Sequence, residues 1–176
     1  FLGQKAYNLK KLYLLGYPVP PGFVISTEIF RRKNTILRHP ELMTDIDKSV
    51  RHHINRLEKL TGKEYGNKNN PLLLSVRSGA SITMPGAMNT FLNVGVNEEI
   101  IHNLSKQDNY AWTAWDCYRR FLQTWGMSYG IKRDAFDQII SGYKETYNIE
   151  MKAEFNPQQM RDIAFEYKNM IKNYNI

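Results

Sequence analysis

The part of the sequence best suited to chemistry is a short apolar run that ends in an arginine and a loop of small residues. Residues 72–76 have the length and composition of a buried strand, and Arg77 follows directly. The loop after it is built from small residues, including Ser78 and Gly86. Small side chains let backbone N–H groups approach an anion, and the planar guanidinium suits phosphate oxygens. The pattern is compatible with phosphate binding, but a solvated arginine beside an ordinary turn is the simpler interpretation of these residues alone.

Several other kinds of site are absent from the sequence. The loop lacks the Gly-Lys-Ser/Thr of a P-loop and the G-x-G-x-x-G of a dinucleotide site. Adjacent His52 and His53 would point to different faces of a helix, and no carboxylates have an obvious metal-site spacing. The single cysteine, Cys117, excludes an internal disulfide and suits a core position better than that of a nucleophile. We therefore expect no metal site and no catalytic residue within this stretch.

Local patterns predict the elements that would position Arg77. Prolines at 18, 20 and 21 enforce an extended connection, and apolar runs predict strands at 23–26, 72–76 and 91–96. Periodicity and capping residues predict helices over 4–15, 27–37 and 40–60, the last with Pro40 in its first turn. From Asn97 the pattern is helical almost throughout, with Asn156 capping and Pro157 opening the last helix.

Two apolar stripes predict the core of the helical second half. One is aromatic and recurs every three or four residues: Trp112, Trp115, Tyr118, Leu122 and Trp125. The other lies on the last helix: Met160, Ile163, Ala164, Tyr167, Ile171 and Tyr174. We interpret the aromatic stripe as core packing, not as a platform for stacking bases. The chain is thus expected to be α+β and mostly helical, with an α/β part at 1–96 and a helical subdomain at 97–176.

Composition limits the cellular and chemical setting. The 176 residues carry a formal net charge of +7, but the basic residues are scattered, so charge alone supports a nucleic-acid partner only poorly. No apolar run is long enough to span a membrane, and no signal peptide is evident. One cysteine fits a reducing cytoplasm. The absence of an initiator methionine suggests a fragment.

Three segments carry a resemblance to a known family. The stretch from Ser75 to Ala80 with that from Met84 to Thr90 is similar to the ATP-binding segment of the pyruvate phosphate dikinase and phosphoenolpyruvate synthase family. The opening, with Lys5 and a later Gly-Tyr-Pro-Val-Pro-Pro-Gly-Phe, resembles the family's first motif. Residues 117–121 are close to its S-Y-R-R-F. The similarity extends over essentially the whole chain.

The resemblance implies the N-terminal part of an ATP-grasp nucleotide-binding domain, with a small sheet that strands from later in the chain would complete. It implies that Lys5 and Arg77 reach ATP phosphates and that the loop lines them, giving an ATP-binding set of Lys5, Arg77, Ser78, Gly86, Met88, Asn89 and Thr90. The whole enzyme would convert ATP, phosphate and pyruvate to phosphoenolpyruvate, AMP and pyrophosphate through a phosphohistidine. Its Mg²⁺ ligands would lie mostly outside this stretch, and a homodimer of the whole protein is left open.

Departures from the family pattern keep alternatives open. Gln4 and Ala6 replace usual glycines, and Asn89 replaces a usual aspartate, which removes a negative charge near the expected phosphates. A phosphoenolpyruvate synthase-type enzyme and a non-catalytic nucleotide-binding or regulatory module of the same fold are the alternatives. The Met-Pro-Gly-Ala-Met-Asn-Thr form favours the dikinase branch. On either reading, the stretch alone is expected to be inactive.

Overall fold

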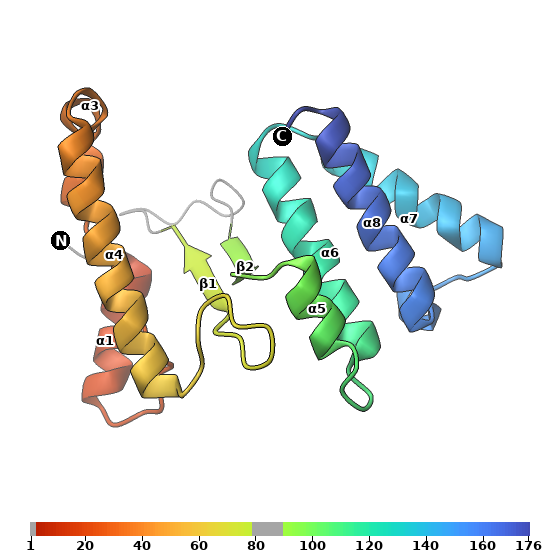
Figure 1. Cartoon of the computed structure of the whole chain (residues 1–176), viewed down its shortest axis with the longest axis horizontal. Coiled ribbons are helices and arrows are strands. Elements are labelled where there is room, and N and C mark those ends of the chain that lie inside the picture. Colours follow the sequence, from red (N-terminus) through yellow and green to blue (C-terminus); the bar gives the residue numbers. More distant parts are fainter. Residues whose placement is uncertain (1–2, 79–89) are drawn as a thin grey trace. The chain divides into compact units, whose positions relative to one another are not determined.

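The computed structural model describes residues 3–78 and 90–176, which form two compact units (Figure 1). One unit contains residues 3–65 and Ser78, and the other contains residues 66–77 and 90–176. The predicted α+β, mostly helical class is confirmed, because one small antiparallel sheet accompanies a set of helices. The two strands belong to the same unit as the helices of the second half.

The first unit consists of four helices in the described residues. They are α1 (Gln4–Leu14), α2 (Thr27–Arg31), α3 (Lys33–Arg38) and α4 (Pro40–Thr61). Pro40 occupies the first turn of α4, where backbone N–H groups have no helical acceptor, so the missing N–H of proline costs no hydrogen bond. Gly62 ends the helix in a left-handed conformation at φ 67°. The predicted helices are confirmed, with a break at Arg32 between α2 and α3.

The strand expected at 23–26 is wrong. Residues 21–26 have neither strand nor helix, because a strand needs a paired neighbour and none of the described residues pairs with this run. Phe23 instead stacks its ring on His53 of α4, with ring centroids 5.2 Å apart. The apolar face of α1 is not covered either: no α1 residue is buried, and Leu57 is the one buried apolar side chain among those described in residues 3–65.

The second unit is built around the contact between two long helices. α6 (Ala111–Ser128) packs along α8 (Pro157–Asn173), while α5 (Glu98–Leu104) and α7 (Arg133–Tyr147) pack against this pair (Figure 1). A short 3₁₀ turn, η1 (Lys152–Glu154), precedes α8. The predicted caps are present, since the Asn97 side chain accepts from the Ile100 N–H at 2.9 Å and Asn156 forms a capping box with Gln159. Among the described residues, no helix combines the length and apolarity that crossing a membrane requires.

The α8 stripe forms the centre of this core, and the α6 stripe contributes most of its expected members. The fully buried side chains include Tyr167, Phe136, Ile101, Met160 and Ile163. Trp115, Tyr118 and Leu122 of α6 are also buried, but Trp125 is 38% exposed and Tyr174 is 57% exposed, so these two assignments to the core are wrong. A helix turns about 100° per residue, and at the last turn of α6 that rotation brings Gly126, not Trp125, to the core-facing side.

Gly126 lies where neighbouring side chains leave no room for a Cβ, and it gives a test of this packing. A Cβ at Gly126 would meet the Phe136 Cζ at 2.7 Å and the Ile171 Cγ1 at 3.1 Å, whereas a Cβ at Gly142 of α7 would meet nothing within 4 Å. We expect Gly126→Ala to lower the free energy of unfolding by about 1–3 kcal/mol through overpacking. Gly142→Ala should raise it by up to about 1 kcal/mol through helix propensity. Urea unfolding of both variants checks this, and equal effects would contradict the close approach.

Candidate functional site

The predicted phosphate-binding arginine lies at the end of the two-stranded sheet. β1 (Leu74–Arg77) pairs antiparallel with β2 (Thr90–Val94), and Arg77 lies opposite Thr90 in the register. Val76 lies opposite Phe91, and the pairing is irregular between Leu74 and Val76. The strands expected at 72–76 and 91–96 are thus confirmed with slightly shifted bounds. Their pairing brings together two predicted ATP-binding residues that are thirteen positions apart in the sequence.

One face of this sheet is turned toward α6. The Phe91 ring lies edge-on to Trp125 of α6, with centroids 6.4 Å apart, and β2 packs against α6. Since successive side chains of a strand alternate between faces, Thr90 and Leu92 lie on the opposite face. Arg77 shares that face, because directly paired residues point to the same side. Arg77 is therefore an exposed guanidinium on the face that α6 does not cover.

The remaining predicted binding residues fall into two groups. Lys5 is exposed in the first turn of α1, but it belongs to the other compact unit, so its approach to Arg77 stays a prediction. Ser78 follows β1 directly and is exposed. Gly86, Met88 and Asn89 lie outside the described residues. The structure therefore brings Arg77 and Thr90 together and leaves the rest of the expected set untested.

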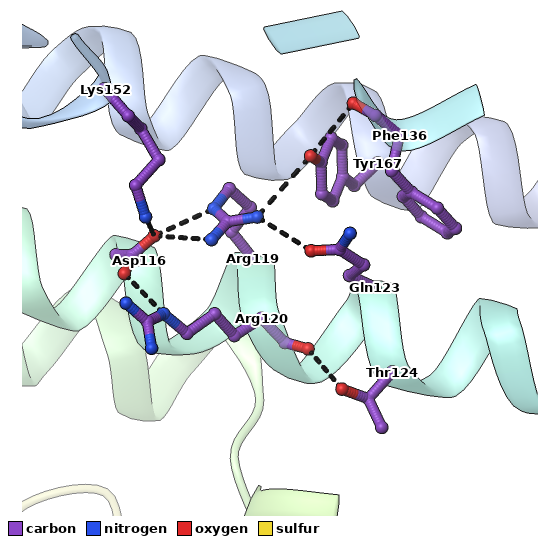
Figure 2. A network of polar contacts seen from close by, with 8 residues as sticks. All are labelled: Asp116, Arg119, Arg120, Gln123, Thr124, Phe136, Lys152 and Tyr167. Atoms are coloured by element: carbon purple, nitrogen blue, oxygen red, sulfur yellow. Dashed lines mark hydrogen bonds and ion pairs between the residues drawn. The ribbon is translucent and has the colours of Figure 1, made fainter. Parts of the chain in front are cut away.

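A network of charged groups on α6 ties the helices of the second unit to one another (Figure 2). Asp116 is buried and its carboxylate is shared by three cations: Arg119 at 2.8 Å, Arg120 at 2.7 Å and Lys152 at 3.0 Å. Figure 2 shows the Arg119 guanidinium reaching from α6 toward Tyr167 of α8. The Tyr167 hydroxyl donates to the Phe136 carbonyl of α7 at 3.0 Å. This chain of contacts connects η1, α6, α8 and α7.

The environment of Asp116 stabilises its charged form. Burial by itself would raise the pKa of the carboxyl, but the Arg119 charge and the hydrogen bonds from Lys152 and Arg119 outweigh it and hold the pKa below its ordinary value. Burial raises the pKa of the Tyr167 hydroxyl despite the neighbouring Arg119. Burial, with some help from Asp116, also raises the pKa of the half-buried Cys117 thiol, which fits a packing role better than that of a nucleophile.

A second polar contact joins α5 to the same helices. Glu98 accepts from the Tyr118 hydroxyl of α6 at 3.3 Å and pairs with Lys168 of α8. Burial and the nearby Glu98 carboxylate raise the pKa of Tyr118 well above its ordinary value, so this phenol stays protonated. Within the third sequence motif, Tyr118 thus contacts α5 and Arg119 contacts α8.

Sequence reasoning did not anticipate the Asp116 network. The spacing of Asp116 from Arg119 and Arg120 is a helical i, i+3 and i, i+4 pattern and was readable. The third cation, Lys152, is 36 positions away and no local pattern marks it. No group of three or more His, Cys, Asp or Glu side chains able to hold a metal occurs among the residues that the structure describes.

Comparison with known proteins agrees with the motifs. No protein-family model matches the chain. Pyruvate, phosphate dikinase of Rhizobium meliloti (strain 1021) is 38% identical over 173 residues, which cover 97% of this chain and 19% of that protein. The enzyme of the same name from Clostridium symbiosum is 32% identical over 172 residues, covering 97% and 20%. The chloroplastic one from Mesembryanthemum crystallinum is 33% identical over 170 residues, covering 96% and 18%.

The chain therefore spans about a fifth of the length of these curated relatives. The aligned residues cover 96–97% of this chain, and the identity is well above what chance motifs produce. The resemblance found in the sequence is confirmed: almost all of this chain is similar to one part of curated proteins named pyruvate, phosphate dikinase.

Proposed function

We propose that this chain forms part of the ATP-binding region of a pyruvate, phosphate dikinase-type phosphotransferase. That enzyme would use ATP, phosphate and pyruvate to make phosphoenolpyruvate, AMP and pyrophosphate through a phosphohistidine outside this stretch. The observation that supports the proposal best is the pairing of Arg77 with Thr90 on the face of the sheet that α6 leaves uncovered. The similarity to curated dikinases over nearly the whole chain supports the same reaction class.

Arg77 would act by neutralising charge. Phosphoryl transfer depends on positioning and on stabilising the negative charge of the phosphates, and needs little covalent chemistry from this part of the protein. A guanidinium offers five N–H donors in a fixed fork and stays charged at all relevant pH values. The strand pairing fixes where the Arg77 backbone lies, and the Thr90 hydroxyl on the neighbouring strand would add a hydrogen bond to the same phosphate oxygens.

Lys5 would supply a second cation. Its position in the first turn of an eleven-residue helix is favourable for anions, because the first N–H groups of a helix have no intrahelical acceptor. The first turn of α1 contains no acidic residue that would compete for the lysine or repel phosphate. We propose that Lys5 and Arg77 contact the same nucleotide. Four residues between Arg77 and Thr90 in the sequence would line it: Ser78, Gly86, Met88 and Asn89.

Magnesium does not fit the described residues. Mg²⁺ is bound by carboxylate and other oxygen ligands, and the described residues contain no acidic cluster suited to a metal. We therefore propose that any Mg²⁺ used with ATP is held mostly by residues outside this stretch.

A non-catalytic nucleotide-binding module is the second candidate. The observation that favours it is Asn89, which stands where the family usually has an aspartate, together with Gln4 and Ala6 in place of glycines. Such a module would keep ATP affinity and lose phosphorylation. Measuring ATP binding and ATP-dependent phosphorylation separately in the full-length protein distinguishes the two: binding without any phosphoryl transfer would select the module.

The isolated 176-residue chain is expected to bind ATP weakly and to neither hydrolyse it nor become phosphorylated. An effective pocket buries most of its ligand, and a partial site can neither enclose ATP nor hold reacting groups in line. The binding that remains would be mainly charge attraction, so it should weaken as salt is added. Titration calorimetry at low and high salt and a labelled-phosphate assay check this, with Arg77→Ala as the reference. Tight, salt-independent binding with turnover would show that this chain holds a complete site.

A further inference from the structure

The sheet face that carries Arg77 and Thr90 also carries an exposed leucine. Successive side chains of a strand alternate between faces, so Leu92 lies on the same face of β2 as Thr90, and the register places Thr90 opposite Arg77. Leu92 is 38% exposed, whereas the other four residues of β2 are half-buried. A single exposed leucine is common on protein surfaces. What distinguishes Leu92 is that it lies beside the two proposed phosphate contacts.

β2 is irregular at Leu92 and Asn93. Its pairing with β1 shifts there, so that these two residues lie opposite the single residue Ser75. Asn93 has a left-handed backbone conformation, with φ 59°. Bulges of this kind occur often beside binding and catalytic sites, where the extra residue changes the direction of a side chain. The bulge therefore supports a binding role for the part of the sheet around Leu92.

The position of Leu92 fits the nucleoside part of ATP better than its phosphates. A strand rises about 3.3 Å per residue, so Leu92 lies about 7 Å along β2 from Thr90. The residues expected to line the phosphates follow Arg77 and precede Thr90 in the sequence, so they join the sheet at its Arg77 end. Leu92 lies on the other side of Thr90. A nucleotide with its phosphates at Arg77 and Thr90 would therefore direct its ribose and base along the strand toward Leu92.

The chemistry of a leucine side chain agrees with this direction. Leucine has no charge and no hydrogen-bonding group, so it cannot bind phosphate, whereas the ribose and base present apolar surface whose removal from water is favourable. We propose that Leu92 contacts the nucleoside part of ATP and so favours a nucleotide over a bare polyphosphate. This inference rests on the proposed ATP site at Arg77 and extends that site from the phosphates to the nucleoside.

Titration of the full-length protein with ATP and with inorganic tripolyphosphate tests this, because tripolyphosphate presents the phosphates without ribose or base. We expect Leu92→Ala to raise the Kd for ATP about three- to tenfold, since an apolar contact is lost, and to leave the Kd for tripolyphosphate unchanged. The retained tripolyphosphate affinity would show that the variant is folded. Leu92→Met should restore most of the ATP affinity, because methionine keeps an apolar side chain of similar volume.

Two further variants separate this inference from the ATP site on which it rests. Leu42→Ala is the matched control, because Leu42 of α4 is 37% exposed, and it should change neither Kd. Arg77→Ala should weaken both ligands, since both present phosphates. If Arg77→Ala weakens both ligands but Leu92→Ala affects them equally, affects neither, or matches Leu42→Ala, the role of Leu92 is wrong and the phosphate site stands. If Arg77→Ala weakens neither ligand, the proposed ATP site is wrong, and this inference with it.

Discussion

Arg77→Ala in the full-length protein is expected to reduce ATP-dependent phosphorylation tenfold to a hundredfold. A hydrogen bond to a charged group contributes about 1.5–3 kcal/mol, and each 1.4 kcal/mol corresponds to about tenfold. Arg77 is exposed on the sheet face opposite α6, and the strand register places it opposite Thr90, so the substitution removes charge without removing core packing. The effect should therefore appear in nucleotide use while the free energy of unfolding stays nearly unchanged.

Arg31→Ala is the matched control for this prediction. Arg31 is also an exposed arginine, but it lies on α2, where it pairs with Glu28 at 3.0 Å; exposed surface pairs contribute about 0–1 kcal/mol. Phosphorylation of the full-length protein with labelled ATP compares the two variants. Arg77→Lys should recover part of the activity, because an ammonium restores the charge but not the planar fork. If Arg77→Ala and Arg31→Ala behaved alike, Arg77 would be only a solvated residue at a strand end.

Elements that depend on local rules could be predicted from the sequence. The start of α4 follows from Pro40, which has no backbone N–H that would need an acceptor in the first turn. The starts of α5 and α8 follow from Asn97 and Asn156, whose side chains accept hydrogen bonds from N–H groups of the first turn. The strand before Arg77 was likewise readable from its apolar run and its bounding residues.

Features that depend on distant neighbours could not be predicted in the same way. Residues 23–26 have strand-like composition, but a strand exists only if another pairs with it. Trp125 continues the three- and four-residue spacing of the aromatic stripe, yet it is exposed, because the rotation of the helix brings Gly126 to the core at that turn. The contact of Lys152 with Asp116 spans 36 positions and follows from the docking of η1 on α6.

For the candidate site, the sequence predicted the residues, and the structure supplies the arrangement of two of them. Arg77 and Thr90 were identified from a motif, and the strand register explains how they become neighbours. The motif could not indicate which face of the sheet they share, because this depends on where α6 packs. The approach of Lys5 to Arg77 joins the two compact units and stays a prediction.

Asp116→Asn is expected to lower the free energy of unfolding by about 3–5 kcal/mol, because it leaves a buried cation without its counter-ion. The Arg119 side chain is only 7% exposed and its Nε donates to the Asp116 Oδ1 at 2.8 Å. Asn keeps the size of Asp but removes the charge that Arg119, Arg120 and Lys152 share. Asp47→Asn is the matched control, since Asp47 pairs with Arg51 at the same 2.8 Å but both side chains are well exposed. Urea unfolding of both variants should show a large loss for Asp116 and a change of at most about 1 kcal/mol for Asp47.

The titration of the Asp116 carboxylate determines how the loss of stability in Asp116→Asn depends on pH. The pKa of Asp116 is lower in the folded chain than the value of about 3.9 expected when it is unfolded. The folded state therefore binds this proton less readily, and the stabilisation is fully present above pH of about 4. It is lost as the pH falls through the folded-state pKa, where the native carboxylate becomes protonated. We therefore expect the stability gap between the unsubstituted chain and Asp116→Asn to be constant near neutral pH and to close in acid. A gap that stayed open at the lowest pH at which both proteins fold would mean that packing, and not charge, makes Asp116 important.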